Sequence, residues 1–163
     1  MNTFRNIHIA SVATLAMAVV ALATAGSGVA APAPLSPQSA ITVRQAGFKK
    51  MGAAMKALNE QLKSGAPAKG PIAGYVQTIA ATAREQGRLF PAGSGPTAGI
   101  KTDALANIWT DRATFDAQMG KLVAESGKLA AATSGNDMDA IRAQAKATGA
   151  VCAGCHRQFR ADS

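Results

Sequence analysis

The chain has 163 residues, of which 48% are hydrophobic but only 4% aromatic. This length suggests one domain, and an apolar share supplied largely by alanine favours closely packed helices over a β-sandwich. The formal net charge is +8, yet lysines and arginines are scattered singly with little aromatic interleaving, so nucleic-acid binding is not indicated. A basic surface of this kind suits acidic redox partners or anionic membrane surfaces.

Residues 1–31 have the pattern of a secretory signal peptide. Arg5 provides a positive start, an uncharged apolar run covers residues 9–23, and small residues follow. The run is shorter than the roughly 20 residues that a membrane-spanning helix needs, which favours cleavage over anchoring. Cleavage after Ala25 or after Ala30 fits the pattern. We therefore expect residues 32–163 to be the single mature domain.

The first helix is predicted over residues 37–63. Ser36 is a suitable N-cap with Pro37 at the first helical position, and Ser64-Gly65 provides a stop. An apolar stripe follows the helical spacings of three and four residues, and one member is a charged arginine. Burying that charge is costly unless it has a partner. The stripe consists of Ile41, Arg44, Phe48, Met51, Met55, Leu58 and Leu62.

The second helix is predicted to start at Gly70-Pro71 and to end before Pro91, since proline cannot continue a helix. Its buried side is expected to carry Ile72, Tyr75, Val76, Ile79, Ala83 and Leu89. Residues 90–99 contain too much glycine and proline for a regular element, so a long connecting loop is expected there.

The third helix is expected to begin near Asp111, after Ile108-Trp109, and to stop around Ser134-Gly135. Asn136 or Asp137 can cap the fourth. The sequence thus has four amphipathic helices and no strand pattern, which predicts an all-α antiparallel four-helix bundle with a long second connection. The third stripe consists of Phe115, Met119, Leu122, Ser126 and Leu129, and the fourth of Met138, Ile141, Ala145, Thr148, Cys152, Cys155 and Phe159.

The segment 152–156 fits the C-x-x-C-H pattern of c-type haem attachment, in which two thiols form thioethers and the histidine ligates iron. On a helix, Cys152, Cys155 and His156 share one side. Other interpretations fit less well. A thioredoxin-like pair needs βαβ patterning, which is not seen around the motif. Structural zinc needs about four Cys or His ligands, and besides the three residues of the motif the chain offers only His8, in the predicted signal peptide. A disulfide between the two cysteines would leave His156 unexplained.

A mono-haem bundle with its attachment motif in the last helix resembles the cytochrome c′ family. The similarity covers essentially the whole mature chain and rests on several segments in order. These are Ile41-Thr42-Val43-Arg44-Gln45-Ala46-Gly47-Phe48, Leu89-Phe90-Pro91, Ile108-Trp109-Thr110-Asp111 and Cys152-Ala153-Gly154-Cys155-His156-Arg157-Gln158-Phe159-Arg160.

The resemblance implies one covalent haem c inside the bundle near the C-terminal helix, high-spin and five-coordinate, with His156 as the axial iron ligand. Phe48 would close the distal side, admitting NO and CO while offering no hydrogen bond to O₂. Arg44 would pair with a haem propionate, and Arg160 would lie near the proximal imidazole. A homodimer through the first two helices also follows from the resemblance. A periplasmic location follows from the predicted export signal together with haem attachment, since c-type cytochromes are typically matured outside the inner membrane.

Several alternatives stay open at this point. Phe48 can be read as an ordinary core aromatic, and Arg44 as a side chain that reaches solvent at a helix edge. Met51 or Met55 could supply a sixth ligand, giving a low-spin electron-transfer cytochrome with a redox protein partner. Trp109 and Tyr75 are interpreted as packing residues. Enzymatic turnover is not expected, since the mature chain has no second histidine for acid–base work.

Overall fold

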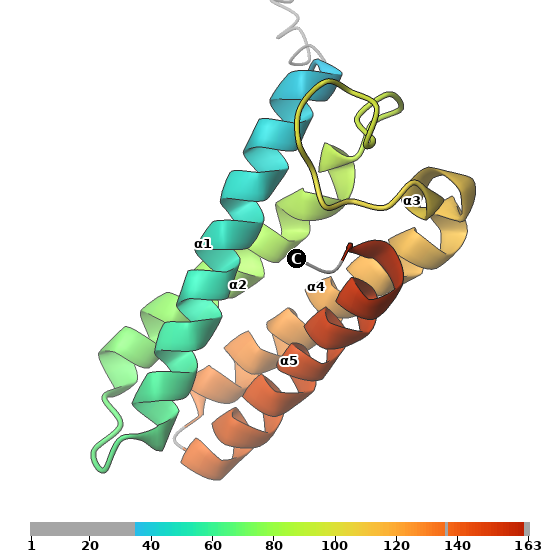
Figure 1. The fold of residues 1–163 in the computed structure, drawn as a ribbon. Helices are drawn as coiled ribbons and strands as arrows, with labels where there is room; N and C mark the ends of the chain where they lie inside the picture. Colours follow the sequence, from blue (N-terminus) through green and yellow to red (C-terminus); the bar gives the residue numbers. More distant parts are fainter. Residues whose placement is uncertain (1–34, 136, 162–163) are drawn as a thin grey trace, which may run out of the picture. The chain divides into compact units, whose positions relative to one another are not determined.

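The computed structural model describes residues 35–135 and 137–161, so the predicted signal peptide and Asn136 lie outside the described part. The elements are α1 (Pro37–Lys63), α2 (Lys69–Gln86), a 3₁₀ helix η1 (Gly87–Leu89), α3 (Asn107–Thr110), α4 (Arg112–Ser134) and α5 (Met138–Phe159) (Figure 1). The all-α prediction is confirmed. Within the described ranges the one β-type pairing is an isolated antiparallel bridge between Ala104 and Arg160.

The N-terminal ends of α1 and α5 are determined by side-chain caps. At α1, the Ser36 hydroxyl oxygen accepts a hydrogen bond from the Ser39 backbone N–H at 3.1 Å, and Pro37 occupies the first position. At α5, one carboxylate oxygen of Asp137 accepts from the backbone N–H groups of Asp139 and Ala140 at 2.9 and 3.1 Å. Asp137 is therefore the N-cap of α5, and the predicted bounds of α1 are confirmed.

Two details differ from the sequence prediction. Helix α2 ends at Gln86, and the last turn before Pro91 tightens into η1. The short helix α3 was not expected, because a single turn is too short to produce a hydrophobic period. It buries Ile108 and brings the Trp109 indole N–H within 2.9 Å of the Pro91 carbonyl oxygen, which closes the crossover loop on itself.

Four helices make the bundle, with the core between them. Helix α1 packs along α2, α2 along α4, and α4 along α5, whereas α1 and α5 share only a few contacts (Figure 1). We call the boundary between these two helices the α1–α5 seam. The short connections at 64–68 and 135–137 produce antiparallel neighbours, while residues 90–106 form the long crossover loop. None of the described helices has the length and apolar character that crossing a bilayer requires.

The predicted stripes form the buried core. Helices α1 and α2 approach closely at Gly47, where a Cβ atom would overlap the amide of Gln86. Gln86 is buried, and its Oε1 atom has no hydrogen-bond partner among the described residues. Only glycine at position 47 leaves room for this buried amide. The core includes Met51, Leu58, Ile72, Ile79, Phe90, Phe115, Met119, Leu122, Leu129, Ile141 and Phe159.

Candidate functional site

The predicted attachment residues lie in the last turns of α5, at the edge of the core. Cys152 and Cys155 are free thiols, half-buried, and packed against the core cluster. Burial raises the pKa of both thiols, and the neighbouring Cys152 raises that of Cys155 further. Both sulfurs are therefore protonated at neutral pH.

His156 follows directly and is exposed. Its partial burial and then the nearby charge of Arg160 lower the pKa of the imidazole from its ordinary value. The ring is accordingly neutral at neutral pH, which is the form that ligates a metal. In residues 35–135 and 137–161 it is the one histidine, and no three His, Cys, Asp or Glu side chains gather there as a metal centre.

Arg160 leaves α5 at its C-terminal end. Its guanidinium is exposed and forms an ion pair with Asp103 at 3.3 Å. The backbone on either side of it is fixed to the crossover loop: the Leu105 N–H donates to the Phe159 carbonyl at 3.0 Å and the Ala161 N–H to the Asp103 carbonyl at 2.8 Å. The segment that follows His156 is therefore held in place by residues far away in the sequence.

Arg44 is 2% exposed, so the alternative in which it reaches solvent is wrong. Its Nη1 donates to the Ser94 hydroxyl at 2.9 Å and to the Leu89 carbonyl at 3.4 Å. Its Nη2 donates to the Ser94 carbonyl at 2.8 Å and to the Thr102 hydroxyl at 3.0 Å. The guanidinium also lies 4.5 Å from the ring centroid of Phe90. Arg44 thus binds the crossover loop at two places, Ser94 and Thr102, and holds both against α1.

These contacts satisfy the buried charge with neutral acceptors. Burial lowers the pKa of the Arg44 guanidinium, although an arginine remains charged at any physiological pH. Within the described part of the chain only Nε lacks an acceptor, and pairing with a haem propionate stays a prediction. Sequence reasoning missed Ser94 and Thr102, because a serine in a glycine-rich loop gives no signal. The only clue was that a buried arginine needs acceptors.

Phe48 is half-buried on the side of α1 that meets the core. Its ring packs edge-on against Phe90 at 6.3 Å between centroids. Phe90 in turn packs against Phe115 at 4.6 Å, and Phe115 against Phe159 at 5.4 Å. This series of rings connects α1 with the end of α5, three residues beyond His156. Within the described segments, the ring that Phe48 contacts is Phe90, and no ring pair joins Phe48 directly to His156.

The candidate methionines occupy different environments. Met51 is 6% exposed and belongs to the core cluster, while Met55 is half-buried at its edge. Trp109 and Tyr75 both pack against the core, which confirms their interpretation as packing residues. Of the two methionines, Met55 is the one whose side chain is partly uncovered.

A haem group fits the α1–α5 seam on chemical grounds. Both helices carry half-buried apolar side chains that pack against the core, so the core is only partly covered near the boundary where α1 and α5 make few contacts. The haem would supply an iron that can be ligated by His156 and exchange electrons. The half-buried side chains are Phe48 and Met55 on α1, and Val151, Cys152 and Cys155 on α5.

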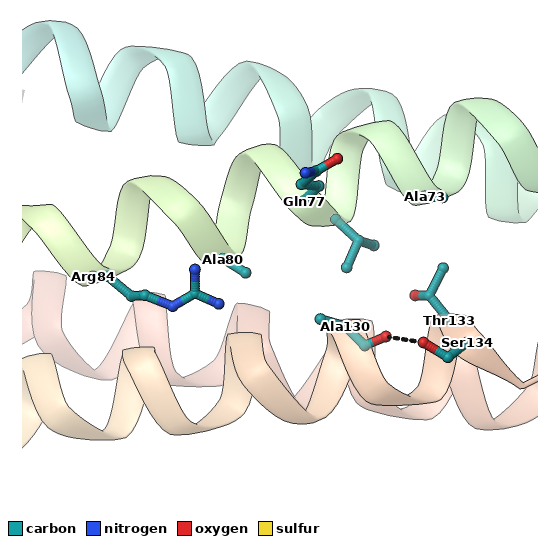
Figure 2. Close-up of a pocket in the computed structure, with 8 residues that line it drawn as sticks. Ala73, Gln77, Ala80, Arg84, Ala130, Thr133 and Ser134 are labelled. Atoms are coloured by element: carbon teal, nitrogen blue, oxygen red, sulfur yellow. Dashed lines mark hydrogen bonds between the residues drawn. The ribbon is translucent and has the colours of Figure 1, made fainter.

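A separate cavity of about 400 Å³ lies between α2 and α4 (Figure 2). Arg84 stands at one end and Thr133 and Ser134 at the other, with small alanine side chains between them. The Ser134 hydroxyl donates to the Ala130 carbonyl of its own helix at 3.4 Å. None of the predicted site residues lines this cavity, so it is distinct from the α1–α5 seam.

The four-helix bundle with a C-x-x-C-H motif in its last helix defines a mono-haem c-type cytochrome. A sequence model of the cytochrome c′ family matches residues 39–160. The chain belongs to the cytochrome c′ family, and it carries one covalently attached haem c.

Individual relatives agree with this assignment. The chain is 33% identical to cytochrome c′ of Rhodospirillum rubrum over 90% of its own length and 97% of that protein. A cytochrome c′ structure with ligand-controlled dimer dissociation superposes with a TM-score of 0.74 at 25% identity, covering 80% of this chain and all of that one. Single-residue variants of cytochrome c′ from Alcaligenes xylosoxidans, in complex with nitric oxide and with carbon monoxide, give a TM-score of 0.70 at 26% identity, with 78% of this chain and 98% of that one covered.

Proposed function

We propose that this cytochrome c′ is a periplasmic protein that binds NO and CO at a high-spin, five-coordinate haem. Cys152 and Cys155 attach the haem and His156 ligates the iron. The observation that carries the proposal is the position of Phe48, half-buried at the seam with its ring against Phe90. Residues 1–31 act as the cleaved export signal, in accord with assembly of c-type cytochromes outside the inner membrane.

Phe48 decides which ligands are accepted. A phenyl ring has no lone pair to offer iron and no proton to donate. Over the distal position it therefore keeps water away from the iron but does not itself become a ligand. Edge-to-face contact between two rings is worth only about 1 kcal/mol, so a small uncharged molecule can displace Phe48 at little cost. Bound O₂ gains from a distal hydrogen-bond donor, which this ring does not supply. Selectivity for NO and CO over O₂ follows.

The relatives support this proposal by analogy. Single-residue variants of the Alcaligenes xylosoxidans protein were solved with NO and with CO bound. Dimer dissociation under ligand control in another relative supports a homodimeric state for this chain. The contact through α1 and α2 is what the family resemblance implies. The proposal assigns reversible binding, as a sink or carrier of NO, rather than enzymatic turnover.

A second candidate is a low-spin electron-transfer cytochrome with a methionine as sixth ligand. Of the two candidate ligands, Met55 is the more suitable, because its side chain is only half-buried. Met51 is less suitable, since moving it would open the core.

The absorption and EPR spectra of the purified ferric protein at neutral pH separate the two. A high-spin spectrum that changes on adding CO to the reduced protein is the expected result. A low-spin, six-coordinate spectrum would contradict the five-coordinate proposal. If that spectrum became high-spin in Met55→Ala but not in Met51→Ala, the electron-transfer alternative would replace it.

A further inference from the structure

The α1–α5 seam is bordered by exposed cations from three segments of the chain. We call these residues the seam ring. Their positions follow from contacts that close the seam at its two ends. The ring consists of Lys49, Lys56 and Lys63 on α1, Lys101 in the crossover loop, and Arg142, Lys146, Arg157 and Arg160 on α5.

On α1, Gln45 identifies the side that faces the seam. Its Nε2 donates to the Lys101 carbonyl at 2.8 Å, and the loop continues from there to the bridge with Arg160 at the end of α5. Lys49, Lys56 and Lys63 follow Gln45 by 4, 11 and 18 residues, spacings that return to the same side of a helix. These three lysines therefore form one row along this side of α1.

On α5, Arg142 identifies the corresponding side. Its Nε donates to the Leu62 carbonyl at the end of α1, at 3.2 Å. Arg160 lies 18 residues further, five full turns, and so falls on the same side. Lys146, one turn after Arg142, and Arg157 flank this row. The two rows thus run along opposite borders of the seam.

The acidic residues near the ring leave its charge largely uncompensated. Glu60, Asp139 and Asp103 each hold one ring cation, at 3.9, 2.8 and 3.3 Å respectively. The other ring members have no carboxylate within ion-pair distance in the described part of the chain. They are Lys49, Lys63, Lys101, Lys146 and Arg157.

The helices away from the seam are closer to balance. On α2 and α4 and the segment after α2, the acidic side chains Glu85, Asp116 and Glu125 pair with neighbouring cations. Asp111 adds a further carboxylate there. The surplus positive charge of the chain is therefore concentrated around the seam, where the haem would lie.

We infer that the seam ring is a docking surface for an electron-carrier protein with an acidic face. This inference rests on the proposed function only in placing the haem at the seam. Complementary charge raises the association rate and orients the partner toward the seam. The partner's one-electron centre is oxidised by one electron and the ferric iron is reduced to ferrous, with no bond made or broken.

A protein partner fits the ring better than a lipid surface does. A helix face that binds membranes combines cations with large apolar side chains that enter the bilayer. The large exposed apolar residues of the described chain are Leu35 and Val43. Leu35 precedes α1, and Val43 lies two residues before Gln45, which turns it about 200° away from the ring. The ring is thus purely electrostatic.

The test is reduction of the ferric holoprotein by an acidic plant-type [2Fe–2S] ferredoxin, followed by stopped flow at several salt concentrations. We expect Lys49→Glu with Lys63→Glu and Lys146→Glu to lower the second-order rate constant at least about tenfold at low salt and to remove its decline with salt. Lys50→Glu with Arg84→Glu and Lys121→Glu is the matched control, with the same change of charge off the ring. It should react within about twofold of the wild type.

Chemical shifts, CO binding and binding to phosphatidylglycerol vesicles complete the test. Amide chemical shifts should move in residues 45–63 and 142–160 when ferredoxin is added, and CO binding to the reduced ring variant should match the wild type. Equal slowing in both variants would mean that only net charge matters and would overturn the inference. It would also fail if the ring variant lost binding to phosphatidylglycerol vesicles but kept its ferredoxin rate. A low-spin wild-type spectrum would instead refute the proposed function and leave the docking result standing.

Discussion

Arg44 illustrates how a charged residue can be part of a core. Its guanidinium is fully desolvated, yet four hydrogen bonds and the face of Phe90 replace the lost water. Hydrogen bonds from a charged group are worth about 1.5–3 kcal/mol each when the partner is otherwise left unpaired. The residue therefore stabilises the crossover loop as well as occupying the stripe of α1.

We expect Arg44→Met to lower the free energy of unfolding by about 2–4 kcal/mol, because Ser94 and Thr102 lose their buried donor. Urea denaturation followed by circular dichroism measures the change. Gln45→Ala, which removes one exposed hydrogen bond, is the control and should cost under about 1 kcal/mol. A loss confined to the haem-loaded protein would instead identify a propionate as the main partner of Arg44.

Phe48 is the residue proposed to cover the distal side of the haem iron and to slow the entry of ligands. We predict that Phe48→Ala accelerates CO binding to the reduced protein, since no ring must be displaced. Flash photolysis with CO recombination measures the rate. Phe115→Leu, which alters the same series of rings away from α1, should leave it nearly unchanged. Association rates identical in Phe48→Ala and wild type would show that the ring does not cover the iron.

The attachment motif is tested by chemistry. In Cys152→Ala with Cys155→Ala, haem should be extracted by acidified organic solvent, whereas the wild type should retain it because thioethers resist acid. Absorbance of the two phases after extraction gives the answer. Haem that stayed with the double variant would refute attachment at these cysteines.

At the scale of the helix, α5 is defined at both ends by interactions that the sequence shows unequally. The Asp137 cap was one of two candidates, because Asn and Asp are comparable N-caps and only geometry separates them. The C-terminal end is held by backbone pairing with residues 103–105, which no sequence pattern indicates, since such bonds do not depend on side-chain identity.

Loss of the α5 cap should be measurable. Asp137→Ala is expected to destabilise the protein by about 1 kcal/mol, because two backbone N–H groups lose their acceptor. Thermal unfolding monitored by circular dichroism measures the effect. Asp139→Ala, which removes only an exposed ion pair with Arg142, should cost clearly less. Equal losses would mean that the cap contributes nothing beyond its charge.

The helix boundaries were predictable where a local signal exists. Ser36, Pro37 and the heptad-like stripe gave the bounds of α1, since capping and periodicity act over a few residues. The end of α2 and the existence of α3 were not predictable. Both depend on how Pro91 and Trp109 pack against the bundle, and their bond joins residues 18 positions apart.

At the scale of the molecule, the sequence placed the motif on the inward side of the last helix but could not show which neighbour it faces. The stripes of Phe48 and Cys152 each indicate burial, whereas the order of the helices around the core depends on all their contacts together. The structure supplies this: α5 packs along α4 and leaves its other border open toward α1. The seam is therefore a tertiary feature, although the stripes predict that Phe48 and Cys152 face the core.

Because α1 and α5 share few contacts, we expect these two helices to have the lowest local stability in the absence of haem. In the Cys152→Ala with Cys155→Ala protein stripped of haem, amide hydrogen exchange should accelerate most in residues 44–55 of α1 and 148–159 of α5. The middle of α2 and α4 should stay protected, because these helices keep their neighbours on both sides. Mass spectrometry of exchanged peptides measures this. Uniform acceleration in all four helices would contradict the assignment of the seam as the haem-dependent boundary.

The contacts of the crossover loop also determine where the chain can accept inserted residues. Exposed loops rich in glycine and proline are usually where a protein accepts inserted segments. This loop differs, since Arg44 holds residues 94 and 102, Gln45 holds residue 101, and the end of α5 holds residues 103–105. An added segment there would have to break these bonds. The turn at 64–68 is the place where the chain can lengthen, so a reporter peptide belongs between α1 and α2.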